Sequence, residues 1–305
     1  MGRGWPRWAA ACLVLAAGSS SAADADVLAR GAYVYRASGC LACHTEDRAG
    51  GAPLAGGRAL ATPLGTFLAP NVTPDPEHGI GRWSESDFAR ALTRGVAPDG
   101  SPYYPSFPYT SYTRMRPEDV SVLWAYLRTV EPVAAPDRPH ELPLVLRARW
   151  VNWFWRALYF TPGAFADDPS RTAEWNRGAY LAEAMAHCGE CHTPRNALGG
   201  TDDTRRYAGA VQGAEGGAVP NITPDRATGI GRWRPGDLAE YLASGATPSG
   251  DYAGGGMAEV IENGTRHLAA ADRAAIAAYV LSLPAVENAG GRKERGATKP
   301  RGEFD

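Results

Sequence analysis

Two short cysteine and histidine motifs constrain what this chain can fold around. Residues 40–44 read Cys-Leu-Ala-Cys-His and residues 188–192 read Cys-Gly-Glu-Cys-His. In a Cys-x-x-Cys-His motif the two thiols attach covalently to a haem, and the adjacent histidine reaches one face of its iron. We therefore expect two covalently bound haem c groups. The attachment points are Cys40, Cys43, Cys188 and Cys191, and the proximal iron ligands are His44 and His192.

The cysteine count agrees with this interpretation. The chain has five cysteines, four of which belong to the two motifs. The fifth, Cys12, falls in an N-terminal segment that we expect to be removed. No thiol then remains for a disulfide, a zinc site or a catalytic nucleophile. Thioredoxin-like redox pairs are the alternative, but they occur in a βαβ context, whereas the segments around these motifs have helical patterns rich in Gly and Pro.

The N-terminus resembles a secretory signal peptide. Arg3 and Arg7 precede an apolar run over residues 8–17, and small residues follow at 18–23. Such a run is too short to cross a bilayer, so we expect cleavage after residue 22 and a periplasmic protein. Cleavage would remove two arginines and no acid, which changes the formal charge from −2 to −4. This acidic balance argues against nucleic-acid binding, which calls for a basic stripe.

The chain also contains an internal repeat. Three segments recur in the same order and at similar spacing: Arg30-Gly-Ala-Tyr33 with Arg177-Gly-Ala-Tyr180, Asn71-Val-Thr-Pro-Asp75 with Asn221-Ile-Thr-Pro-Asp225, and Gly79-Ile-Gly-Arg-Trp83 with Gly229-Ile-Gly-Arg-Trp233. A duplication of this kind predicts two homologous domains of ordinary size. We expect a signal peptide at 1–22, domains at 23–131 and 171–287, a linker rich in proline and aromatic residues at 132–170, and a polar tail at 288–305.

Each predicted domain is helical. In the first we expect helices over 25–38, from Ser84 and over 117–130, and in the second over 175–186, 234–244 and 270–283. The pair Ser84 and Asp87 resembles a capping box, and Pro117 suits the first turn of a helix. Gly31 and Gly178 lie inside helices, where glycine normally costs stability. Their recurrence indicates a close approach between the first and last helices of each domain.

These motifs resemble those of the cytochrome c subunits of bacterial membrane-associated dehydrogenases, such as the alcohol and gluconate dehydrogenases. The resemblance covers nearly all of the expected mature chain. It includes the repeated segments and also the stretches 104–109, 173–180 and 191–196. It implies an all-α fold of two tandem, class I-like cytochrome c domains. Members of that family carry a third haem domain, so we expect a two-haem relative that serves another dehydrogenase.

The resemblance also implies methionine as the sixth iron ligand, because a thioether raises the haem potential. Met257 precedes the last helix of its domain and is our candidate for the second haem. In the first domain the family has methionine where this sequence has Phe107. Two interpretations remain: Met115 coordinates the first haem, or it only packs and leaves the sixth position open. Met185 is interpreted as a core residue.

Other candidate residues surround the haems. In related cytochromes a proline carbonyl accepts a hydrogen bond from the proximal histidine, and Pro53 is placed to do so. His78, His140 and His267 are expected to be exposed rather than ligands. Trp83 and Trp233 either donate to haem propionates or simply pack. The segment 147–160 carries many aromatic residues, which either pack between the domains or form a docking surface for a dehydrogenase or a membrane.

We expect an electron carrier rather than an enzyme. It would take electrons from a periplasmic or membrane-associated dehydrogenase and pass them to a cytochrome, a quinone or an oxidase of the respiratory chain. The alternative is a two-haem enzyme, a peroxidase or thiosulfate dehydrogenase, with an open distal site on the first haem. This alternative follows from Phe107, because phenylalanine cannot coordinate iron where the family has methionine.

Overall fold

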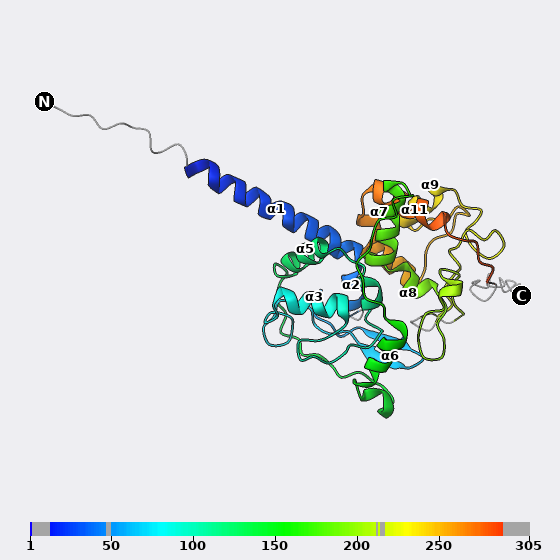
Figure 1. Cartoon of the computed structure of the whole chain (residues 1–305), viewed down its shortest axis with the longest axis horizontal. Coiled ribbons are helices and arrows are strands. Elements are labelled where there is room, and N and C mark those ends of the chain that lie inside the picture. Colours follow the sequence, from blue (N-terminus) through cyan, green and yellow to red (C-terminus); the bar gives the residue numbers. More distant parts are fainter. Residues whose placement is uncertain (2–12, 47–49, 212, 214–216, 289–305) are drawn as a thin grey trace, which may run out of the picture.

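The computed structural model describes residues 1, 13–46, 50–211, 213 and 217–288. Most of the predicted signal peptide's charged start, with Arg3, Arg7 and Cys12, lies outside the described residues, as does nearly all of the predicted tail. Helix α1 (Leu13–Ala37) includes the expected cleavage point and extends away from the body of the molecule at its N-terminal end, as Figure 1 shows. The rest of the chain forms two halves that lie side by side (Figure 1).

The first half contains the end of α1 and the elements that follow it. These are α2 (Cys40–His44), β1 (Ala59–Thr62), β2 (Gly65–Leu68), α3 (Glu85–Arg94), α4 (Tyr109–Tyr112) and α5 (Pro117–Leu127). Helix α3 begins with the expected capping box. The Ser84 hydroxyl accepts from the Asp87 amide, and the Asp87 carboxylate accepts from the Ser84 amide, each at 3.1 Å. Together these bonds satisfy two amides that the helix itself leaves without partners.

The connecting segment and the second half repeat the helical pattern. Their elements are the short helix η1 (Leu144–Arg147), α6 (Val151–Tyr159), α7 (Ala173–Tyr180), the π-helical turn η2 (Leu181–Met185), α8 (Cys188–His192), the short helix η3 (Asp203–Arg205), α9 (Pro235–Ser244), α10 (Gly256–Asn263), the short helix η4 (Thr265–His267) and α11 (Ala270–Leu281). The helices predicted for the two repeats are therefore present, mostly with small shifts at their ends. Two differ more: α1 begins at Leu13 rather than near residue 25, and the helix predicted over 175–186 is divided into α7 and the π-helical turn η2. None of the helices in the described part of the chain is both long and apolar enough to cross a lipid bilayer.

The two repeated glycines lie where the first and last helices cross, as expected. Helix α1 packs on α5, and α7 packs on α11. A Cβ added at Gly31 would lie 2.6 Å from the Cβ of Tyr126, and one at Gly178 would overlap the backbone of Ala275. Both positions therefore require glycine, because the partner helix presents backbone or Cβ atoms that cannot turn away. The packing interpretation of these glycines is confirmed.

The repeated Arg-Gly-Ala-Tyr segments join the two halves through exchanged hydrogen bonds. The Tyr33 hydroxyl donates to Asp272 of α11, and the Tyr180 hydroxyl donates to Asp119 of α5, each at 2.5 Å. Within its own half, Arg177 forms two hydrogen bonds with Asp272. Each aspartate therefore binds a tyrosine from the other half. This reciprocal pairing gives the contact between the halves an approximate two-fold character.

The expectation of an all-α fold was incomplete. Strands β1 and β2 form an antiparallel hairpin, with Ala59 opposite Leu68 and Thr62 opposite Gly65. The linker joins this hairpin, because Thr66 and Glu141 exchange backbone hydrogen bonds of 3.0 and 2.9 Å. The linker is thus more than a tether, since it adds an edge to the hairpin of the first half. This pairing places residues 137–142 against the site described next.

Candidate haem sites

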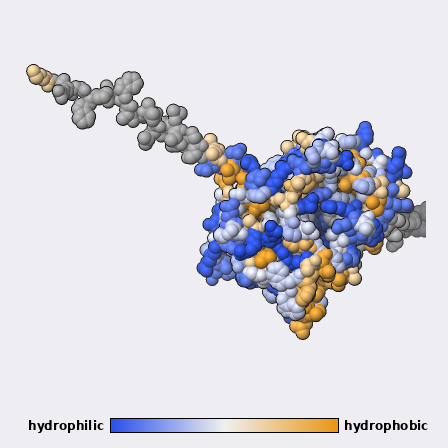
Figure 2. Space-filling view, viewed as in Figure 1, coloured by the Kyte–Doolittle hydropathy of each residue, from blue (hydrophilic) through white to orange (hydrophobic). Residues whose placement is uncertain are grey.

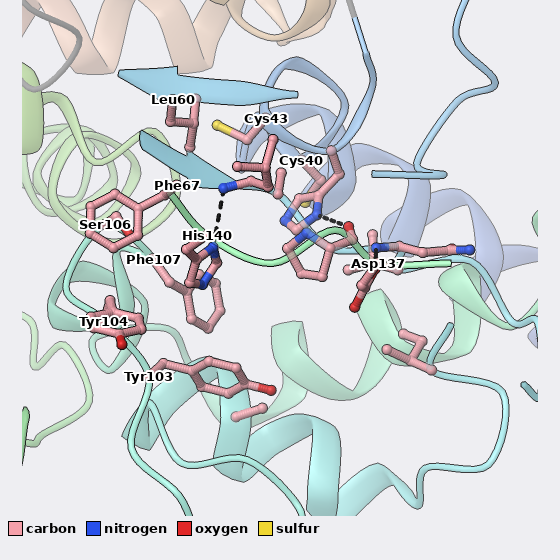
Figure 3. A pocket seen from close by; sticks show the side chains of 18 of the residues that line it. Cys40, Cys43, Leu60, Phe67, Tyr103, Tyr104, Ser106, Phe107, Asp137 and His140 are labelled. Carbon is pink, nitrogen blue, oxygen red and sulfur yellow. Dashed lines mark hydrogen bonds between the residues drawn. The ribbon is translucent and has the colours of Figure 1, made fainter. Parts of the chain in front are cut away.

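A cavity of about 1080 Å³ opens in the first half, and the first Cys-x-x-Cys-His motif lies on its wall. Its volume slightly exceeds the range of roughly 300–1,000 Å³ that is usual for sites of small molecules and cofactors. Cys40, Cys43 and His44 of α2 line one part, and the lining includes Phe67, Phe107 and residues of the linker. Figure 3 shows Cys40 and Cys43 on one side, with Phe107, Tyr103 and Tyr104 on the other. The cavity is mainly apolar, as a buried porphyrin requires.

The motif histidines are held in the tautomer that a metal ligand needs. His44 Nδ1 lies 2.8 Å from the carbonyl oxygen of Pro70, and His192 Nδ1 lies 2.8 Å from that of Pro220. A carbonyl can only accept, so each Nδ1 carries the proton and each Nε2 keeps its lone pair for a metal. Burial lowers the pKa of His44 and His192, which also favours the neutral imidazole.

The expectation that Pro53 accepts this hydrogen bond was wrong. The acceptors are Pro70 and Pro220, each of which directly precedes a repeated Asn-x-Thr-Pro-Asp segment. A proline conserved between the two copies of the repeat was therefore the available sequence signal.

The repeated asparagine explains why that carbonyl is held in place. The Asn71 side-chain oxygen accepts from the amide and hydroxyl of Thr73, while its amide donates to the carbonyl of Val133 at 2.8 Å. Asn221 does the same with Thr223 and the carbonyl of Val286. Both asparagines are buried. Each therefore fastens the proline loop beneath the proximal histidine to the segment that follows the last helix of its half.

Two of the four motif thiols, those of Cys40 and Cys188, lie in surroundings that disfavour a redox or zinc role. Burial, together with the neighbouring Cys43, raises the pKa of Cys40 to about 12, and burial raises that of Cys188 to about 11. Reactive Cys-x-x-Cys pairs instead have a lowered thiol pKa. Among the residues that the structure describes, no three His, Cys, Asp or Glu side chains gather as a metal-ion site. These thiols are better suited to holding a cofactor than to exchanging disulfides.

Around the cavity of the first half, the structure separates Phe107 from Met115. Phe107 lines the cavity, whereas Met115 is not among the described residues that line it. The Met115 side chain is 2% exposed and belongs to the apolar core. Met185 is also a core residue, as expected. Met257 lies in the first turn of α10 and is half-buried, and its role as a ligand stays a prediction.

Two histidines are less exposed than expected. His78 and His140 are both half-buried and both line the cavity, so the prediction that they are solvent-exposed was wrong. His267 is exposed, and its Nε2 bonds the carbonyl of Glu262. His140 enters the cavity because the linker pairs with β2, a long-range contact that no local pattern announces. Trp83 lines the same cavity, and its bond to a haem propionate stays a prediction, as does that of Trp233.

The second motif contacts the first half directly. Glu190, inside this motif, accepts hydrogen bonds of 2.7 Å from the hydroxyls of Thr110 and Ser111 and pairs with Arg195. Burial raises the pKa of Glu190, but Arg195 and the two hydroxyls outweigh this effect, so the pKa of Glu190 is lowered. A further ion pair, Arg58 with Glu259, also joins the halves. Sequence reasoning missed these contacts because their partners come from distant parts of the chain, and Glu190 occupies a variable position of its motif, where the first copy has Ala42.

Comparison with known proteins identifies the relatives of this chain. The cytochrome c family model matches residues 28–131. A diheme cytochrome c-type protein of Cereibacter sphaeroides is 45% identical over 85% of this chain and 86% of its own length. The fructose dehydrogenase cytochrome subunit of Gluconobacter japonicus is 41% identical over 86% of this chain. The gluconate 2-dehydrogenase cytochrome c subunit of Pantoea cypripedii is 38% identical over 90% of it.

The relatives differ in length from this chain. The matched region covers 54% of the fructose dehydrogenase subunit and 63% of the gluconate dehydrogenase subunit. The dehydrogenase relatives are named as cytochrome subunits, in agreement with electron transfer rather than catalysis. The fold, the cavity beside the first haem motif and these similarities lead to one conclusion. The chain belongs to the c-type cytochrome family that includes this diheme cytochrome and the cytochrome c subunits of bacterial dehydrogenases.

Proposed function

We propose that this protein is a periplasmic two-haem cytochrome c that carries electrons from a partner dehydrogenase towards the respiratory chain. The observation that supports it most is the matched pair of motif histidines, each with Nδ1 bonded to a proline carbonyl at 2.8 Å. When bound, each haem iron accepts and releases single electrons. The chain's own residues attach the haems, orient the proximal imidazoles and exclude water with an apolar cavity. The receiving cytochrome, quinone or oxidase belongs to the same proposal.

Haem counting tests the proposal. Expressed with a haem-attachment system, the protein should carry two haems per chain by intact mass. Replacing Cys188 and Cys191 with alanine should leave one haem, and replacing Cys40 and Cys43 should leave the other. A wild-type protein with a single haem, or one whose haem is lost on denaturation, would contradict the proposal.

The sixth ligands can be assigned with three methionine variants. We propose Met257 for the second haem, so Met257→Leu should remove its methionine-to-iron charge-transfer band. Met115→Leu separates the two interpretations for the first haem, because loss of a band would establish coordination by Met115. Met185→Leu is the matched control, since Met185 is a core residue. An unchanged spectrum in Met257→Leu would overturn the assignment to the second haem.

The position of Phe107 favours one alternative function. Phe107 lines the cavity and Met115 does not, an arrangement that would leave the sixth position of the first haem open. An open sixth position is what a peroxidase-type or thiosulfate dehydrogenase-type enzyme requires. Carbon monoxide binding to the reduced protein tests that condition. A gas-binding haem with turnover of peroxide or thiosulfate would favour the enzyme, whereas two haems that bind no gas would favour the pure carrier.

The segment 147–160 both packs and remains exposed. On its inner side, the Trp155 indole donates to the carbonyl of Leu198 at 2.9 Å, which joins α6 to the second half. On its outer side, Trp150, Phe154 and Leu158 are 63–69% exposed. Figure 2 shows this hydrophobic projection at the lower edge of the molecule, where Figure 1 places α6.

We propose that this outer face touches the membrane surface. Aromatic side chains favour the interface between lipid and water, and the exposed Arg147 beside them would attract anionic headgroups. The packing interpretation and the docking interpretation of this segment thus apply to different side chains of one helix. Such a contact would hold the carrier near a membrane-associated partner.

A further inference from the structure

His140 occupies an unexpected place in the cavity beside the first haem motif. Its ring packs edge-on against the rings of Phe67 and Tyr104, at centroid distances of 5.4 Å each, and those two rings also contact each other at 5.3 Å. Its Nδ1 accepts a hydrogen bond of 3.1 Å from the backbone amide of Leu68. Figure 3 shows the ring projecting into the cavity near Phe67 and Phe107, with this hydrogen bond dashed. Three contacts therefore fix the ring orientation of a residue that belongs to the linker.

The hydrogen bond to Leu68 determines which nitrogen of His140 carries the proton. A backbone amide can only donate, so Nδ1 of His140 must be the unprotonated nitrogen. In the neutral ring the proton then lies on Nε2. His44 has the opposite arrangement, because its Nδ1 donates to a carbonyl and its Nε2 keeps a lone pair. Two histidines of one cavity are thus prepared for different tasks, one to bind a metal and the other to donate a hydrogen bond.

We propose that His140 is a positioning residue that donates its Nε2–H to an acceptor oxygen of the haem complex in this cavity, and that it is not an iron ligand. This inference rests on the proposed attachment of haem to Cys40 and Cys43. It also assigns a role to a cavity histidine that the sequence alone did not reveal.

The surroundings of His140 support a neutral donor facing a negatively charged oxygen. Burial lowers the pKa of His140, and the positive charge of Arg149 lowers it further, while Asp137 opposes them. Arg147 and Arg149 line the same cavity as His140. Asp137 and Glu141 line the cavity as well, so it is the N–H donors of His140 and of the two arginines that match a carboxylate or another oxygen-bearing anion.

Two oxygen sources share this chemistry. One is a haem propionate, and the other is an oxygen-bearing ligand at the sixth position of the iron, on the side of Phe107. A donor to the propionate reduces the effect of its negative charge on the iron, so losing the donor should favour the oxidised haem. A donor to the sixth-position ligand instead slows release of that ligand.

Two substitutions at His140 separate the donor from its structural role. His140→Asn keeps an oxygen that can accept from the Leu68 amide but removes the donor at the Nε2 position. His140→Gln retains an N–H group near that position. His267→Asn is the matched control, because His267 is exposed and does not line the cavity. The readouts are haem count by mass, the reduction potential of each haem, and the rates of cyanide binding and release.

We expect all variants to keep two haems. A failure of haem attachment in the wild-type protein would therefore count against the proposed function and not against the role of His140. If the acceptor is a propionate, the equilibrium constant for reduction of the first haem should fall about tenfold in His140→Asn, which for one electron is about 59 mV. If the acceptor is the sixth-position ligand, cyanide release should become faster instead. His140→Gln should restore most of this change, and His267→Asn should show none.

The pattern of results identifies the acceptor. A potential shift without a change in cyanide release indicates the propionate, and faster cyanide release without a potential shift indicates the sixth-position ligand. Two outcomes would overturn the proposal. One is a His140→Asn protein whose potential and cyanide kinetics both match wild type. The other is a bis-histidine spectrum in wild type that disappears in the variant, because His140 would then be an iron ligand.

Discussion

The crossing of α7 and α11 provides a quantitative test of how this fold is built. Alanine in place of glycine inside a helix normally stabilises it by about 1 kcal/mol. At Gly178 the added Cβ would overlap the carbonyl oxygen of Ala275 and lie 3.0 Å from the Cβ of Tyr279. Neither partner atom can rotate away, so the two helices must separate. Overpacking of this kind costs about 1–3 kcal/mol, and a backbone obstacle favours the upper end.

We therefore expect Gly178→Ala to lower the free energy of unfolding by about 2 kcal/mol, after the gain in helix propensity. Gly236→Ala in α9 is the matched control, because a Cβ there meets nothing within 4 Å. It should be neutral or stabilising by up to about 1 kcal/mol. Urea unfolding followed by circular dichroism measures both. If Gly178→Ala proved as stable as Gly236→Ala, the close contact of the two helices could not be the reason for this glycine.

Two further changes test the contact between the halves and the exposed helix. Glu190→Gln should cost about 3 kcal/mol in urea unfolding, because it leaves the Arg195 charge without its partner in a largely buried pair. The lowered pKa of Glu190 adds stability above its unfolded value of about 4.3, and this stability is lost as the pH falls through the folded pKa. Stability of wild type should thus drop more steeply below pH 4.3 than that of the variant, and equal slopes would refute the linkage. Joint replacement of Trp150 and Phe154 by serine should weaken binding to anionic vesicles at least tenfold, because each buried side chain contributes about 1.5 kcal/mol or more. Serine at Tyr252, which is 70% exposed elsewhere, should leave vesicle binding unchanged, and equal losses would contradict a specific surface on α6.

The features that short sequence patterns determine could be predicted before the structure was known. The haem motifs, the repeat, the capped helix at Ser84 and the two crossing glycines were all predictable. Each of these features depends on a short sequence pattern or on a pattern that occurs twice in the chain. Haem attachment and helix capping, for example, need only residues that are close in sequence. The close approach at Gly31 and Gly178 was predictable for the same reason, because only glycine meets that need at both copies.

The remaining features depend on contacts between distant residues. The acceptor for His44 lies 26 residues away at Pro70, and the amide that fixes His140 lies 72 residues away at Leu68. The exchanged bonds of Tyr33 and Tyr180 require the two halves to meet face to face. The repeat marks Pro70, Tyr33 and Tyr180, but no local pattern indicates which distant residues they contact, because these contacts form only when the chain folds.

The sequence by itself thus determined what this protein binds covalently and which helices it builds, because thiol chemistry and helix periodicity act over a few residues. Only the tertiary structure decided what surrounds the first haem site. It brought Phe107 and His140 to the cavity and left Met115 in the core, since hydrogen bonds and packing between distant segments, rather than residue type, set which side chains reach a buried cofactor.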